Sequence, residues 1–100
     1  MERRNDIPNL LAMYIRNTSD IYNITSWLQS CVIKKANKGI QPQVEYLANC
    51  SAMKTIIREA AKLLYKYDGI IPTRQEKQET AYEHAKYIFN SVQHSIQKHQ

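Results

Sequence analysis

Apolar residues in the first third of the chain recur at intervals of four and three, which is the spacing of one helix face. Asp6 and Pro8 suit a helix start, and Gly39 suits the position just past a helix end. The periodic positions are Ile7, Leu11, Tyr14, Thr18, Ile21, Thr25, Leu28 and Val32. The pattern predicts one long helix over residues 7–37, and the polar sequence NTSD at 17–20 is where a kink or break would fall.

Two further amphipathic segments follow. The second covers residues 42–67, ahead of the turn residues Asp68 and Gly69. Its inward positions are Val44, Leu47, Met53, Ile56, Ile57, Ala60, Leu63, Leu64 and Tyr67. The third covers residues 73–98 and starts at a capping box, in which Thr73 and Glu76 satisfy each other's backbone N–H groups. Its apolar stripe consists of Ala81, Tyr82, Ala85, Ile88, Phe89, Val92 and Ile96.

Short connections between long helices make sequential helices antiparallel. The 100 residues fit a single domain, and only two Gly and three Pro interrupt them. We therefore expect an all-α protein, an up-down-up antiparallel three-helix bundle in one domain over residues 1–100.

The formal net charge of +5 favours acidic partners such as nucleic acid, an anionic membrane or an acidic protein surface. The N-terminal residues do not form the apolar run of a signal peptide, and no segment approaches the length of a membrane span. We expect a cytoplasmic protein that does not enter a membrane, in which Cys31 and Cys50 are reduced thiols.

Basic residues recur at every fourth position of the second predicted helix, at Lys54, Arg58, Lys62 and Lys66. We call these four residues the basic ladder. Three like-charged pairs at i,i+4 cost an isolated helix about 1 kcal/mol in total, which suggests a use for the charge. Tyr65 lies among them, and single-strand binders combine a basic track with aromatic side chains.

From the sequence alone, the stronger interpretation of the basic ladder is a solvent-exposed helix face without a binding role. Lys and Arg are good helix formers, and a charged outer face keeps any helical bundle soluble. Glu76, Glu79 and Glu83 on the third helix offer carboxylates that would neutralise the ladder within the fold. A helix-turn-helix over residues 44–64 is disfavoured, because the segment keeps helical phase and contains no turn.

A second feature lies on the first predicted helix, where Met13, Ile24, Trp27 and Cys31 form a flank beside the periodic seam. We expect another helix to pack on this flank, which makes Trp27 a core residue, since aromatic stripes are usually buried. The alternative is an exposed patch that anchors a protein partner or a second copy of the chain.

The sequence offers no catalytic, cofactor or metal site. His84, His94 and His99 lack the spacing that places two ligands on one helix face, and neither glycine belongs to a phosphate-binding loop. We expect a protein that is not an enzyme and needs no cofactor.

The leading hypothesis is a small helical interaction protein that binds and modulates a protein partner through the Trp27 flank, the basic ladder or both. In size and make-up it is similar to accessory or inhibitor proteins of phages and mobile elements. The alternatives are a nucleic-acid-binding protein that uses the ladder and Tyr65, and a structural subunit that self-assembles, for example as a homodimer.

Overall fold

The computed structural model describes residues 6–95, in which the regular secondary structure is entirely helical and no strand occurs. The prediction of an all-α protein is confirmed, but three continuous helices are not found. The helices of the described residues are α1 (Ile7–Asn17), α2 (Ser19–Asn37), α3 (Val44–Asn49), α4 (Ser51–Asp68) and α5 (Arg74–Ser91), followed by the 3-10 helix η1 (Gln93–Ser95). Two of the three predicted helices are therefore divided.

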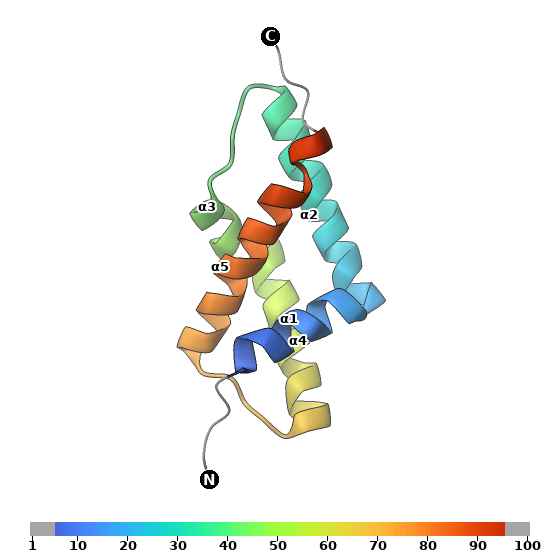
Figure 1. Ribbon diagram of the computed structural model, residues 1–100, viewed down its shortest axis with the longest axis vertical. Helices are drawn as coiled ribbons and strands as arrows, with labels where there is room; N and C mark the ends of the chain where they lie inside the picture. Colours follow the sequence, from blue (N-terminus) through green and yellow to red (C-terminus); the bar gives the residue numbers. More distant parts are fainter. Residues whose placement is uncertain (1–5, 96–100) are drawn as a thin grey trace.

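The first division falls at Thr18, inside the polar sequence that was expected to hold a kink or break. Thr18 has an extended backbone, with φ −110° and ψ 112°, so the chain leaves α1 and starts α2 in a new direction. Short polar side chains such as those of residues 17–20 compete with the helical backbone for hydrogen bonds. Figure 1 shows α1 and α2 set at a wide angle to each other. The prediction of one long helix over 7–37 is wrong.

The second division falls at Cys50, where the prediction of one helix over 42–67 is also wrong. Cys50 is extended, with φ −73° and ψ 161°, and separates α3 from α4. The side-chain amide of Asn49 donates to the carbonyl of Glu45 at 2.8 Å, a local hydrogen bond of the kind by which Asn competes with a continuing helix. Asn, Cys and Ser in succession are weak helix formers, and this lowers the cost of the break.

Three other helix ends follow the predicted chemistry, whereas Asp6 is the N-cap residue of α1 but makes no side-chain capping hydrogen bond. Gly39 has a φ of 85°, and the N–H of Ile40 donates to the carbonyl of Lys35 at 2.8 Å, as in a Schellman motif. Gly69 ends α4 in the left-handed region. The capping box of Thr73 and Glu76 is present at the start of α5. The predicted end of this helix at 98, with Ile96 in its stripe, lies outside the described residues.

Helices α4 and α5 form the centre of the fold, since each of them contacts all the other α-helices (Figure 1). Helix α1 crosses both α4 and α5, α2 packs on the same two helices, and the short α3 packs mainly against α5. The buried hydrophobic residues are Ile7, Leu11, Ile15, Ile21, Leu28, Val32, Leu47, Met53, Ile56, Ile57, Ala60, Leu64, Ala81, Ala85, Ile88 and Val92. Most positions of the predicted seams are among them, but Tyr67, which was predicted to face inward, is 65% exposed.

A polar contact holds α1 to the far end of α4. The hydroxyl of Tyr14 donates to Asp68 at 2.6 Å, and the ring of Tyr14 stacks on that of Tyr67. The hydrogen bond to Asp68, together with burial, raises the pKa of Tyr14 to about 12.

A second polar contact lies in the core between α2 and α5. Thr25 and His84 are both buried, and the Thr25 hydroxyl is hydrogen-bonded to Nε2 of His84 at 2.9 Å. Burial, with a smaller contribution from the positive charge of Arg16, lowers the pKa of His84 to about 4. His84 is therefore neutral in the folded protein at neutral pH.

This contact predicts how stability depends on pH. The unfolded chain protonates His84 near pH 6.5, whereas the folded chain does so only near pH 4. The contribution of His84 to the free energy of unfolding is therefore fully present above pH 6.5. It is lost as the pH drops towards 4, which lowers the free energy of unfolding by about 3 kcal/mol from this group alone. The substitution His84→Gln keeps a hydrogen-bonding group beside Thr25 but cannot titrate, so its denaturation curves should change less over this range. If the free energy of unfolding fell equally with pH in the wild type and in His84→Gln, the assignment of this pH dependence to His84 would be contradicted.

Candidate functional site

A groove of about 980 Å³ lies between α4 and α5. Helix α4 forms one wall, and the first three turns of α5 form the other. The connecting segment contributes Ile71 and Pro72, and the end of α3 contributes Ala48 and Asn49. The remaining lining residues are Lys54, Ile57, Arg58, Ala61, Lys62, Tyr65, Arg74, Lys77, Gln78, Ala81 and Tyr82. The groove thus exists because α5 begins at some distance from α4, at the end of an extended connection (Figure 1).

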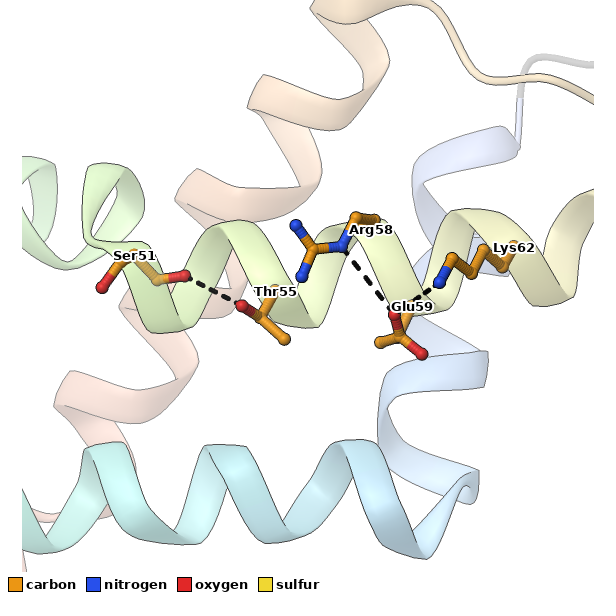
Figure 2. Close-up of polar contacts among 5 residues, drawn as sticks. All are labelled: Ser51, Thr55, Arg58, Glu59 and Lys62. Atoms are coloured by element: carbon orange, nitrogen blue, oxygen red, sulfur yellow. Dashed lines mark hydrogen bonds and ion pairs between the residues drawn. The ribbon is translucent and has the colours of Figure 1, made fainter.

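The charge of this groove has one sign. Its lining contains five basic side chains, three from α4 and two from α5, and no Asp or Glu. Glu59, on the neighbouring flank of α4, lies 3.1 Å from the Lys62 ammonium and 3.8 Å from Nε of Arg58. Figure 2 shows both cations reaching toward this one carboxylate. Exposed pairs of this kind contribute at most about 1 kcal/mol, so a bound anion can compete for both cations.

The basic ladder only partly belongs to the groove. Lys54, Arg58 and Lys62 line it, but Lys66 does not and instead lies over the ring of Tyr67, 5.3 Å from its centroid. The reason is helix geometry, because a step of four residues advances by about 40° around the axis. Three such steps carry the ladder about 120° around α4, so its last member has left the groove wall.

The three glutamates that were expected to neutralise the ladder lie elsewhere. Glu76 completes the capping box, Glu79 accepts from Gln75 at 3.3 Å, and Glu83 pairs with Lys86 at 2.9 Å. None of these carboxylates lines the groove.

Two cations in the groove were not identified from the sequence. Arg74 and Lys77 lie on the first turn of α5 and face the ladder across the groove. Their spacing of three residues places them on one side of a helix, which was a usable signal. Only the packing of α5 shows that this side meets α4.

Tyrosines and small apolar residues complete the surface. Tyr65 is 61% exposed, as expected from its outward position on α4. Tyr82 was predicted within an apolar stripe but is 43% exposed and lines the opposite wall. Between the two walls lie Ile57, Ala61 and Ala81, so that the basic side chains surround an apolar floor.

The structure removes one argument against a helix-turn-helix, because the chain does break at Cys50. The break is a single residue, however, and α3 has only six residues. A helix-turn-helix needs a turn of three or four residues between its helices, so this motif is not present.

The Trp27 flank differs from the expectation of a core residue. Trp27 is 60% exposed, and Met13 is 37% exposed. Ile24 is half-buried against the core, and Cys31 is half-buried. Helix α5 approaches α2 on its other side, where Tyr22 and Tyr87 are hydrogen-bonded.

The grouping of Met13 with Trp27 rested on one continuous helix. The break at Thr18 ends the common helical phase, so the wheel that placed the two side chains on one flank does not apply. Of this flank, Ile24, Trp27 and Cys31 remain on one helix.

Three further findings concern metal binding, membrane insertion and similarity to known proteins. Within residues 6–95 no group of three or more His, Cys, Asp or Glu could hold a metal ion, and His99 lies outside this range. In the same part of the chain, no helix combines the length and apolar character needed to cross a membrane. Comparison of the chain with known protein families, curated proteins and solved structures finds no match.

The exposure of Trp27 predicts a small effect of its removal. Trp27→Ala should lower the free energy of unfolding by no more than about 1 kcal/mol, because surface substitutions have small effects. Leu28→Ala, at a neighbouring position that is 5% exposed, should cost about 2–5 kcal/mol. Urea denaturation followed by circular dichroism measures both variants. If Trp27→Ala lowered the free energy of unfolding as much as Leu28→Ala, Trp27 would be a core residue.

Proposed function

We propose that the protein is a non-enzymatic nucleic-acid-binding protein, and that the groove between α4 and α5 holds the sugar–phosphate backbone. The observation that supports this best is the set of five cations from two facing walls, with no acidic residue among the lining residues. This was the alternative function from the sequence, and it now leads because α5 adds charge to the ladder instead of neutralising it.

The geometry of the charges favours an extended polyanion over a single small anion. Lys54 and Lys62 lie two helical turns apart on α4, which is about 12 Å along the axis. Arg74 and Lys77 lie on the opposite wall. Cations distributed over such a length suit consecutive phosphates, and Arg58 can bind one of them in a bidentate manner.

A second hollow, of about 520 Å³ between α1 and α5, lacks this uniform charge. Its lining includes Arg16 and Lys86 but also Glu83, which pairs with Lys86. A polyanion is therefore better accommodated between α4 and α5.

Phosphate contacts predict a steep dependence of affinity on salt. Each contact to a single strand contributes about 0.7 log units per log unit of salt, so five contacts predict about 100-fold weaker binding at 200 mM than at 50 mM salt. Fluorescence anisotropy of a labelled oligonucleotide titrated with the protein measures this slope. No binding at 50 mM salt would contradict the proposal.

A matched pair of variants locates the phosphate contacts. Lys54→Gln with Lys77→Gln removes one cation from each wall and should lower the salt slope by about 1.4. Lys34→Gln with Lys38→Gln removes the same charge from the end of α2, away from the groove, and should leave the slope unchanged. Equal effects of the two pairs would show that the net charge, and not the groove, attracts the nucleic acid.

A protein partner remains a second candidate, because Trp27 is 60% exposed and exposed Trp is favoured in the centres of interfaces. Trp27→Ala would then weaken association without unfolding the protein. The same exposure of Trp27 suits the third alternative, self-assembly, in which a second copy of the chain covers this side chain.

A further inference from the structure

We infer that the ligand of the groove is a single strand, and that an unpaired base stacks on Tyr65 or Tyr82 above the apolar floor. This inference rests on the proposed function and adds to it, since phosphate contacts alone would serve a duplex equally well.

The floor of the groove is the first observation. Ile57 and Ala61 from α4 and Ala81 from α5 form this floor, and Pro72 and the exposed Ile71 of the connection add apolar lining at one end. Phosphates do not gain from contact with such residues, because burying a charge against apolar atoms is costly. A base does gain, because its flat faces are apolar and its polar atoms lie on its edges.

The tyrosines are the second observation. Tyr65 on α4 and Tyr82 on α5 line the groove from facing helices. Tyr65 is 61% exposed, so much of its side chain is open to a ligand. Tyr82 is 43% exposed, and because the Lys86 ammonium lies 5.2 Å from the centroid of its ring, a base would stack on the opposite face of that ring. Aromatic side chains beside a basic track are the combination by which proteins hold single strands, since every base can stack.

The concave shape of the surface is the third observation. A protein reads duplex DNA by inserting a helix or a β-ribbon into the major groove, where the base edges are accessible. Here the cations surround a hollow between α4 and α5, and each of these helices packs against all the other α-helices. The bases of a duplex are stacked inside it and cannot reach the floor, whereas those of a single strand can turn inward.

The test compares a labelled single strand with the duplex of the same sequence, titrated by anisotropy at about 50 mM salt. We expect the single strand to bind at least about tenfold more tightly. Tyr65→Ala should weaken single-strand binding at least about fivefold, the lower end of what loss of one stacked base costs, while Tyr65→Phe keeps the ring and the affinity. Tyr46→Ala is the matched control, because Tyr46 is similarly exposed, at 60%, but does not line the groove.

A direct readout of stacking uses a single strand that contains the fluorescent base 2-aminopurine. Its emission should be weaker in the complex with the wild type than in the free strand. The decrease should be smaller in the complex with a Tyr65→Ala, Tyr82→Ala double variant. Circular dichroism melting of each variant shows that the fold is intact, as expected for exposed side chains.

The outcomes separate the inference from the proposed function. One outcome is that the single strand and the duplex bind with equal affinity, and that Tyr65→Ala and the Tyr65→Ala, Tyr82→Ala double variant bind as tightly as the wild type. This outcome would overturn the inference and leave the phosphate-binding function. Binding of neither nucleic acid would overturn both. A third outcome is that poly-glutamate binds as tightly as the single strand and that the emission of the 2-aminopurine strand does not change when the protein binds it. This outcome would also overturn the inference and point to an acidic protein as the ligand.

Discussion

The burial of one stripe of α4 is the constraint on which the rest of this structure depends. Met53, Ile56, Ala60 and Leu64 are buried almost completely, and the other helices pack around them. Because the apolar stripe of this helix is narrow, the basic residues must lie on its outer side, wherever the neighbouring helices pack. The position of α5 then decides whether these cations face open solvent or the wall of a groove.

The two breaks determine that position. Helix α3 turns away from the line of α4 at Cys50 and packs mainly against α5. Helix α1 turns away from α2 at Thr18 and crosses both α4 and α5. With α5 held by α1 and α3, its first turns stand apart from α4, and the space between them is the groove. An uninterrupted three-helix bundle would pack α5 along α4 and would leave little room.

The sequence predicted the composition of the core better than the path of the chain. Periodicity identifies residues such as Leu11 and Ile56 because burial depends on the local helical face. It does not identify an extended residue such as Cys50, which ends one helix and starts another within an apolar pattern that remains in phase. The break at Thr18 lay where the polar sequence had placed it, but the choice between a kink and a full break depends on tertiary packing.

The candidate site was predicted in the same partial way. Lys54, Arg58, Lys62 and Tyr65 belong to one helix, so their common side was visible in the sequence. The contribution of Lys77 depends on which face of α5 meets α4, and a single sequence without contacts does not give this.

The charge of the groove has a cost that a ligand would remove. Like charges at i,i+4 on α4 repel one another, and the basic residues of α5 add to this repulsion across the groove. Glu59 offsets part of it from the edge of α4. Functional sites commonly keep such unfavourable arrangements, because the charge that destabilises the free protein is what binds the ligand.

The most direct test of this account is an amide chemical-shift titration of the labelled protein with a short single strand. We predict that the shifts concentrate at Lys54, Arg58, Tyr65 and Lys77, while the indole signal of Trp27 stays in place. Shifts that concentrate on α2 around Trp27, with the α4 and α5 amides unmoved, would contradict the groove as the binding site.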